Sequence, residues 1–570
     1  MNRSWILHKH FLKHYTTRTP LKTPVAVAAK ATLLATALTM AAVPARGAEI
    51  AEVKRPRVIL MNDDSVVYWT YCPERPTADD LLKMLASFDN GVIDALTQNV
   101  HCNWQAYYDS KVVEVAGDLT PEAVRPHDVT HYWHWMTSLR RLIARGDDPP
   151  KVLATGARER GMLFLPSFRL NDRHSVQVYE SHYGSFRRDH PEWKLSEAGN
   201  SGLNYGVPDV REHILKVVRE LAERYDIDGI DLDFMRAPHF FKKNEVKANT
   251  PVMTRFVRRI RSILDEAGES KGRRLLLSAR VPLKIGEGKA INAHELSPDL
   301  ECLGVGLDVP TWIREELIDI VCPMNFFFTA WDRMIVDMAE WRKLTDSSPC
   351  GLYPTIHESA ADKYTPPYID ADSYRGAAHS YYMHGADGVT LYNFHNQIDH
   401  IKGLNDPAAL EAMGRRYHCR LGIEFGVGPV NAQGKRRDKR LPIDFFLPED
   451  PQAKGVNGTL RFTARNLTLD HQIAVDVNGT PIAPDAVAYE RLDVNGLAGS
   501  PNRQYGHEVS FPLAGTAAIS GENVLGVKLI KSNPAIPFVR AGKYGPQWGG
   551  FSITEVEAYF EPRQDRRGSG

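Results

Sequence analysis

Residues 225–236 read YDIDGIDLDFMR and contain the clearest buried strand of the chain. Isoleucine, leucine and phenylalanine alternate there with Asp231 and Asp233, so the two carboxylates share the opposite face of the strand. In a closed parallel barrel that face is the lumen, where a carboxylate is costly unless it is paired or used. The stretch therefore predicts a functional site at the C-terminal end of this strand.

Strand-like and helical segments alternate from about residue 57 to residue 396, which is typical of a parallel α/β fold. Residues 210–225 have apolar positions at helical spacing after a Pro-Asp start signal, and residues 251–267 have an apolar stripe opposite a run of arginines. Eight alternating units predict a (β/α)8 TIM barrel rather than an open doubly wound sheet. The eight strand-like runs are residues 58–61, 92–96, 162–165, 229–234, 275–278, 318–322, 352–355 and 388–392.

The alternation stops near Arg416, and a stretch rich in glycine and charge follows. Beyond it the apolar period becomes two, and Asn478-Gly479 reads as a hairpin turn. Short strands with turn signals predict a smaller antiparallel β-sandwich of jelly-roll type. The expected organisation is a signal peptide (1–47), the barrel (48–424), a linker (425–441), the sandwich (442–563) and a disordered tail (564–570).

The composition excludes several classes of partner and cofactor. The formal net charge of the 570 residues is zero, so nothing indicates a nucleic-acid partner. No Gly-x-Gly-x-x-Gly follows a strand, which leaves a dinucleotide site without support. The six cysteines are scattered without C-x-x-C spacing, and no loop gathers acidic residues, so we expect neither zinc nor calcium. No organic cofactor is implied.

The N-terminus has the features of an export signal. Basic residues precede an apolar run over residues 31–43, and the small residues up to Ala45 or Gly47 fit a cleavage site. The run is short for a membrane anchor, and no later segment is long and apolar enough to span a bilayer. We therefore expect an exported protein, periplasmic or extracellular, whose mature chain has no membrane span.

The motif Asp228-Gly229-Ile230-Asp231-Leu232-Asp233 resembles that of the family-18 chitinases. Those enzymes carry a catalytic glutamate two residues after the motif, where this chain has Met235. A wider resemblance is to glycosyl-hydrolase-like family 10, bacterial barrel proteins presumed to cleave sugars. The stretches that carry it are Asn62-Asp63-Asp64, His190-Pro191-Glu192-Trp193, and residues 207–212, 225–236, 319–325 and 385–389.

This resemblance implies a glycoside hydrolase in which Asp233, and Arg236 after it, are the marked positions. Glycoside hydrolysis uses two carboxyls, one to donate a proton and one to attack or to activate water. We expect Asp233 to be one of them, Glu358 after the seventh strand to be its partner, and Asp231 to support Asp233. The structural alternative is that Asp233 is a lumen acid paired with Arg236 or Arg169.

Polar and aromatic residues after other strands complete an expected carbohydrate-binding site. Amides, arginines and histidines there suit hydroxyl recognition, and exposed aromatic rings would stack on sugar faces. Arg280 and Asn171 lie among these strand-end residues. We expect Trp104 and Trp331 to be exposed. The candidate substrate-binding residues are Asp63, Asp64, Trp104, Arg169, Asp172, Arg236, Asn325, Trp331, His357, Asn393 and His395.

Two other functions stay open at this point. A non-catalytic carbohydrate-binding barrel would account for the missing chitinase-type glutamate. A polysaccharide lyase could use the same fold, since fold does not fix chemistry. A His–Tyr pair without a carboxyl pair would favour the lyase.

Overall fold

The computed structural model describes residues 55–62, 72–89, 91–117, 131–172, 184–196, 202–289, 300–324, 331–357, 370–392, 394, 398–420, 425–428, 439–492, 506–535 and 550–562. The expected signal peptide and C-terminal tail lie outside these residues, as does most of the expected linker. Among the helices in the described ranges, none has the length and apolar character needed to cross a bilayer.

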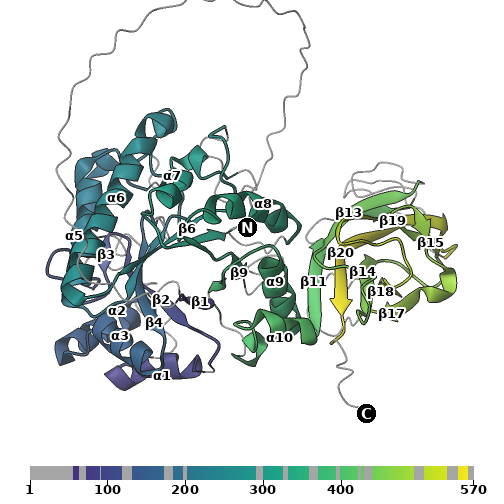
Figure 1. Ribbon diagram of the computed structural model, residues 1–570, viewed down its shortest axis with the longest axis horizontal. Helices are drawn as coiled ribbons and strands as arrows, with labels where there is room; N and C mark the ends of the chain where they lie inside the picture. Colours follow the sequence, from purple (N-terminus) through teal and green to yellow (C-terminus); the bar gives the residue numbers. More distant parts are fainter. Residues whose placement is uncertain are drawn as a thin grey trace, which may run out of the picture. The chain divides into compact units, whose positions relative to one another are not determined.

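A ring of parallel strands forms the first part of the fold (Figure 1). Apart from β8 and β9, which do not pair with each other, each of these strands pairs in parallel with the next, and β1 pairs with the last strand, β10. The strands are β1 (Val58–Asn62), β2 (Ala95–Cys102), β4 (Leu163–Arg169), β5 (Gly229–Asp233), β6 (Leu276–Pro282), β7 (Ile320–Met324), β8 (Gly351–Leu352), β9 (Thr355–His357) and β10 (Val389–Tyr392). This sheet confirms the TIM-like barrel.

The seventh position of the ring is one extended segment that a proline divides. β8 pairs with β7, and β9 pairs with β10. Between them the Tyr353 N–H donates to the Val321 carbonyl at 2.9 Å, and the Thr390 N–H donates to the Pro354 carbonyl at 3.0 Å. Pro354 has no N–H of its own to donate, which interrupts the strand but not the ring.

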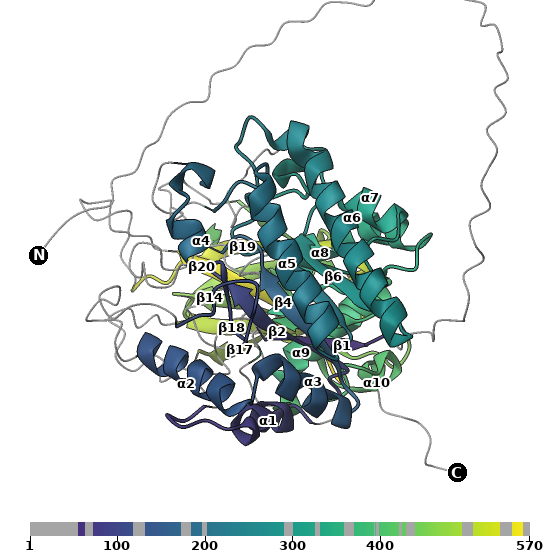
Figure 2. The ribbon, with the colours of Figure 1, turned by 90° about the vertical axis from the view of Figure 1, so that its left-hand side faces the viewer.

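Helices cover the outer face of the ring, and α5 and α6 lie side by side there (Figure 2). Their buried stripes join the strands in one continuous core. α6 begins at Val246, so Pro251 lies inside this helix and does not start it, contrary to the expectation. The helices are α1 (Ala78–Ser87), α2 (His131–Arg145), α3 (Pro149–Glu159), α4 (Ser185–Arg188), α5 (Pro208–Arg224), α6 (Val246–Lys271), α7 (Val309–Arg314), α8 (Trp331–Thr345), α9 (Ala371–Met383) and α10 (Pro407–Ala412).

An aspartate stands one or two residues before every second strand of the ring. Asp228 Oδ2 accepts the Phe164 N–H of the preceding strand at 3.0 Å. Three further carboxylates do the same at their own strands: Asp94 accepts from Val58 at 3.1 Å, Asp319 from Leu277 at 2.8 Å and Asp387 from Leu352 at 2.9 Å. These four residues, the strand-foot aspartates, satisfy donors that begin a strand and have no ladder partner.

Two antiparallel sheets follow the barrel and share one hydrophobic core. Both alternate buried and outward positions, as in β13 and β14. The first sheet contains β11 (Arg415–Arg420), β12 (Phe425–Val427), β14 (Gly458–Arg465), β17 (Ala488–Arg491), β18 (Gly506–Pro512) and β20 (Phe551–Phe560). The second contains β13 (Leu441–Leu447), β15 (Gln472–Val477), β16 (Thr480–Pro481) and β19 (Gly521–Lys531). The jelly-roll type stays a prediction.

The C-terminal sheets begin earlier in the chain than expected. β11 and β12 both pair with β20, so the strand partners of the first sheet start at Arg415 and not at residue 442. The Arg415 guanidinium is buried on the Glu449 carboxylate at 3.0 Å, and the Tyr417 hydroxyl donates to the same carboxylate at 2.7 Å. Polar alternation in RRYHCR hides this strand, because its charged residues are satisfied by partners far along the chain.

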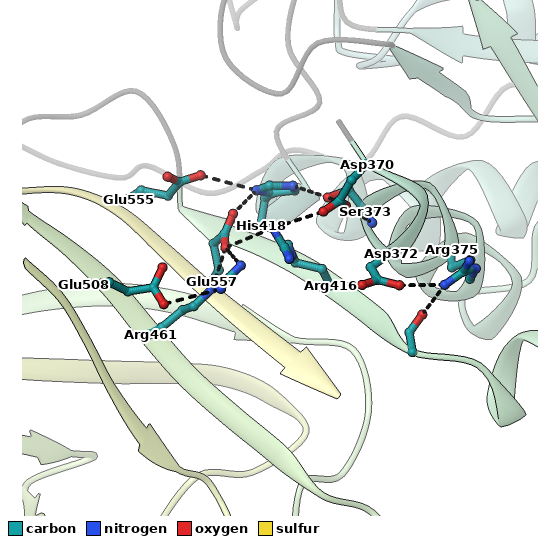
Figure 3. A network of polar contacts seen from close by, with 11 residues as sticks. Asp370, Asp372, Ser373, Arg375, Arg416, His418, Arg461, Glu508, Glu555 and Glu557 are labelled. Carbon is teal, nitrogen blue, oxygen red and sulfur yellow. Dashed lines mark hydrogen bonds and ion pairs between the residues drawn. The ribbon is translucent and has the colours of Figure 1, made fainter. Parts of the chain in front are cut away.

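A polar network joins helix α9 to the first C-terminal sheet (Figure 3). His418 of β11 lies between Ser373 of α9, at 2.8 Å from Nε2, and Glu557 of β20, at 2.8 Å from Nδ1. Glu555 is 3.5 Å from the same Nδ1, and Arg461 holds the other oxygen of Glu557 at 2.6 Å. The network therefore places a histidine between one hydroxyl and two carboxylates.

The proton positions in this network follow from the hydroxyl. Ser373 Oγ donates its only hydrogen to Asp370 Oδ1 at 2.8 Å, so Nε2 of His418 must carry the hydrogen between them. Nδ1 faces carboxylates and carries a second hydrogen in the imidazolium form. Burial alone would lower the pKa of His418, but Glu555 and Glu557 raise it to about 9.

We expect the stability of the protein to fall as the pH rises through this pKa. A histidine whose pKa rises from 6.5 to about 9 on folding stabilises the native state fully below pH 6.5. That contribution, on the order of 3 kcal/mol, is lost as the pH passes 9. Urea unfolding at pH 6 and pH 9.5 measures the loss, and His418→Gln should lose much less stability over the same interval. An equal loss in both proteins would contradict the assignment.

Gly376 of α9 should not tolerate a side chain. A Cβ at this position would overlap the backbone carbonyl oxygen of Arg416 in β11, and neither backbone can yield easily. We expect Gly376→Ala to lower the free energy of unfolding by about 2–3 kcal/mol. Gly272→Ala is the matched control: it has φ +66° but open space, so its cost should be about 1 kcal/mol. Equal losses in urea titrations of the two variants would show that α9 is not closely packed on β11.

Candidate active site

Asp233 ends strand β5 at the C-terminal rim of the barrel. Its Oδ1 accepts the backbone N–H groups of Met235 at 2.8 Å and Arg236 at 3.0 Å, which closes the turn that follows the strand. Its Oδ2 lies 3.4 Å from Nη1 of Arg280. The carboxylate is 1% exposed. Two backbone donors and a guanidinium surround it, an environment that suits a negative charge and an acceptor role.

Asp231 lies two residues deeper in the lumen and is fully buried. It accepts hydrogen bonds from the hydroxyls of Ser167 at 2.7 Å and Ser278 at 2.8 Å, and from Nε of Arg280 at 3.0 Å. Ser167 and Ser278 lie in register with Asp231 on the two neighbouring strands. Arg280 lies two residues after Ser278 on the same strand. Its lone pairs are therefore occupied by the barrel itself.

Arg280 connects the two carboxylates. Its Nη2 is 3.0 Å from Asp231 and its Nη1 3.4 Å from Asp233, and its side chain is buried. The guanidinium offsets the repulsion that two neighbouring carboxylates would otherwise exert on each other. The described contacts place Arg280 beside Asp233, a cation that the structural alternative did not name.

Arg169 and Asp172 form a separate buried pair on the rim after β4. Nη1 of Arg169 is 2.8 Å from Oδ2 of Asp172, and the Cys102 thiol donates to the same oxygen at 2.9 Å. Arg169 is also in register with Asp233 on the neighbouring strand. The structure thus brings two of the expected substrate-binding residues beside Asp233, each already holding the other.

His357 and Tyr392 lie on neighbouring strands β9 and β10, in register with each other. Their ring centroids are 4.8 Å apart, and both side chains are buried. Below them the hydroxyls of Thr355 and Thr390 share a hydrogen bond of 2.7 Å. His357 was an expected substrate-binding residue, whereas Tyr392 was not singled out.

The expectation that Trp104 is exposed is wrong. Its side chain is 2% exposed and packs on Phe186 and His213, with ring centroids 5.6 Å away in each case. Trp104 follows Asn103 in the two-residue turn between β2 and β3 (Gln105–Ala106), and both have positive φ, 51° and 66°. The hairpin turns the ring down into the core, where it cannot serve as a sugar platform.

Several expected site residues lie outside the described residues. They are Asp63, Asp64, Asn325, Glu358, Asn393 and His395. Trp331 begins α8, but its side chain is not described. Arg236 is buried and contributes its backbone N–H to Asp233.

Only one group of described residues brings three metal-ligating side chains together. His418, Glu555 and Glu557 have ligand atoms within 4.8 Å of one another, in the network of Figure 3. A proton on His418 and the guanidinium of Arg461 already balance these carboxylates, so the donor set fits an ion-pair network better than a divalent cation. Around Asp233 the carboxylates of the described residues are paired with Arg169 and Arg280.

Removing Arg280 should destabilise the barrel strongly, because it leaves two carboxylates buried in one lumen. We expect Arg280→Met to lower the free energy of unfolding by about 3–5 kcal/mol. Adding Asp231→Asn should restore part of it, since one charge is then removed with its partner. Arg274→Met, which breaks a more exposed pair with Asp319, should cost about 1 kcal/mol. Urea titrations decide: a loss no larger than that of Arg274→Met would refute the shared guanidinium.

Solved structures with some likeness to this chain include three glycosidases. An α-L-fucosidase isoenzyme 2 from Paenibacillus thiaminolyticus is 12% identical with a TM-score of 0.36, covering 67% of this chain and 53% of its own. The GH36 α-galactosidase AgaA from Geobacillus stearothermophilus gives 12% and 0.36, with 84% and 56% covered. The glycoside hydrolase domain of PgaB (BpsB) from Bordetella bronchiseptica gives 12% and 0.36, with 62% and 98% covered.

The chain spans little more than half the length of the first two structures. Structural similarity at this level carries no information on substrate. Among curated proteins, none matches the chain. Residues 57–250, which contain the first four strands of the ring and Asp233, match the model of the family described as Glycosyl hydrolase-like 10, and the resemblance to that family is confirmed over this part of the chain.

Proposed function

We propose that this protein is a glycoside hydrolase in which Asp233 is a catalytic carboxylate. The observation that carries the proposal is its placement: an acid ends the fourth strand at the C-terminal rim of the ring, where TIM barrels keep their catalytic residues. The matching family supports a carbohydrate as the substrate. The sugar and its linkage follow from neither observation.

The contacts of Asp233 favour one of the two carboxylate roles. A carboxylate that accepts two N–H groups and faces a guanidinium is poised to attack or to activate water, and not to give up a proton. A second carboxyl must then protonate the leaving oxygen, and we propose Glu358 for that role. Asp231, with its bonds satisfied by the barrel, would position Arg280 and thereby Asp233.

Replacing Asp233 should remove activity. Asp233→Asn loses the negative charge and turns an amide towards Arg280, so we expect kcat to fall by about a thousandfold or more. The measurement is release of reducing ends from the polysaccharide or oligosaccharide that wild type cleaves best in a glycan panel. Turnover at the wild-type rate would remove Asp233 from the proposal.

Asp228→Asn is the matched control, since it makes the same change on the same strand at the opposite end of the barrel. Asp228 accepts the Phe164 N–H at the strand foot, so the control should lose stability but keep its kcat at temperatures where it is folded. Loss of kcat in both variants would indicate a general effect on the strand rather than chemistry at Asp233.

One observation favours polysaccharide lyase as the second candidate. His357 and Tyr392 lie together in the lumen, and such a pair could remove a proton from a uronate and protonate the leaving oxygen. A lyase product carries a double bond that absorbs in the ultraviolet. Appearance of that absorbance on uronate polymers, unaffected by Asp233→Asn, would favour the lyase over the hydrolase.

The remaining assignments are proposals on the same footing. Export through the N-terminal segment would suit an enzyme acting on an external or periplasmic polysaccharide. The two C-terminal sheets would act as an accessory module beside the barrel, of sandwich type, that binds glycan or braces α9.

A further inference from the structure

The strand-foot aspartates give a common reference point for heights in the lumen. Each stands one or two residues before a strand and accepts from the strand that precedes it, so the four aspartates lie at equivalent places in the ring. Counting five residues from Asp228 reaches Asp233. The same count from Asp94, Asp319 and Asp387 reaches Asn99, Met324 and Tyr392.

In TIM barrels the side chains of alternate strands meet in one layer of the lumen. Asn99 of β2 therefore belongs to the layer of Asp233. Register gives the direction in which Asn99 faces, because Asn99 pairs with Ser167, whose hydroxyl reaches Asp231 in the lumen. Asn99 thus faces the interior of the ring on the side next to the candidate site.

The amide of Asn99 is unusual in this interior. Its side chain is fully buried, yet neither its oxygen nor its nitrogen has a hydrogen-bond partner in the part of the chain that the structure describes. Buried amides are nearly always satisfied, since an unpaired one keeps the full cost of leaving water. Asn171, two residues past the end of the next strand, shows the ordinary case: its amide bonds three backbone groups, two of Leu203 and one of His239.

We propose that Asn99 is a substrate-binding residue of the active site and that its amide binds a hydroxyl of the sugar ring held at Asp233. This inference rests on the proposed function. An amide offers a donor and an acceptor side by side, which matches a hydroxyl that accepts and donates. A bound sugar would then supply the hydrogen bonds that the Asn99 amide lacks among the described residues.

Stability and activity should move in opposite directions when Asn99 is replaced. Asn99→Leu keeps the shape but removes the unpaired amide, so its melting temperature should equal or exceed that of wild type. Its kcat/KM should fall about a hundredfold. Asn523→Leu is the matched control, because Asn523 is equally buried but bonds Ile519 and Gly521 in the C-terminal sheets. It should melt several degrees lower and keep kcat/KM.

The affinity of an inactive enzyme separates a sugar hydroxyl from the attacking water. In the Asp233→Asn background, adding Asn99→Leu should weaken binding of the cleaved oligosaccharide, chosen from cello-, xylo-, malto- and chitotetraose, at least tenfold by calorimetry. Unchanged affinity would assign Asn99 to the water and overturn the inference. A melting temperature lowered as far as that of Asn523→Leu would also overturn it.

Failure of the proposed function has its own signature. If Asp233→Asn cleaves at the wild-type rate, or wild type cleaves none of the four probes, the active-site assignment falls and Asn99 with it. If Asp233→Asn is inactive while Asn99→Leu retains wild-type kcat/KM, only the role of Asn99 is lost.

Discussion

Closure of parallel strands into a ring is the constraint on which the rest of this structure depends. Once β10 pairs with β1, every second side chain of each strand points into a lumen that water hardly reaches. Polar groups there must satisfy one another or be satisfied by a ligand. The arrangement of Asp231, Asp233 and Arg280 follows from this requirement, because one guanidinium serves two carboxylates and two serines complete the deeper one.

The same constraint distinguishes residues that support the candidate site from residues that could act on a ligand. Residues whose bonds the barrel completes, such as Asp231 and the Arg169–Asp172 pair, hold the geometry of the rim. The carboxylate of Asp233, at the end of its strand, is surrounded by hydrogen-bond donors. The amide of Asn99 has no hydrogen-bond partner among the described residues. The surroundings of Asp233 stabilise a negative charge, and the amide of Asn99 lacks hydrogen-bond partners. Together the two residues point to one place in the lumen where a polar ligand would bind.

Much of the barrel could be predicted from sequence, because apolar runs and helical stripes mark its strands and helices directly. The strand at residues 92–96 was cut short, since Thr97-Gln98-Asn99 reads as polar although it continues into the lumen. Arg280 was recognised only as a strand-end residue. Its partners Asp231 and Asp233 lie on the neighbouring strand, 47 or more residues away in the sequence. β11 was assigned to the barrel, since charges that pair with Glu449 and Glu557 look solvated in sequence. Trp104 looked exposed because a two-residue turn with two positive φ angles cannot be read from Asn-Trp.

The strand-foot aspartates also bear on how the barrel assembles. Each carboxylate accepts a hydrogen bond from the preceding strand near the point where its own strand begins. The ring therefore divides into four pairs of strands, and each pair has one such hydrogen bond. Such a contact needs only two neighbouring strands and not the complete ring, so a pair that forms it early would reduce the entropy that the final closure must overcome. The barrel is in this sense a fourfold assembly of strand pairs.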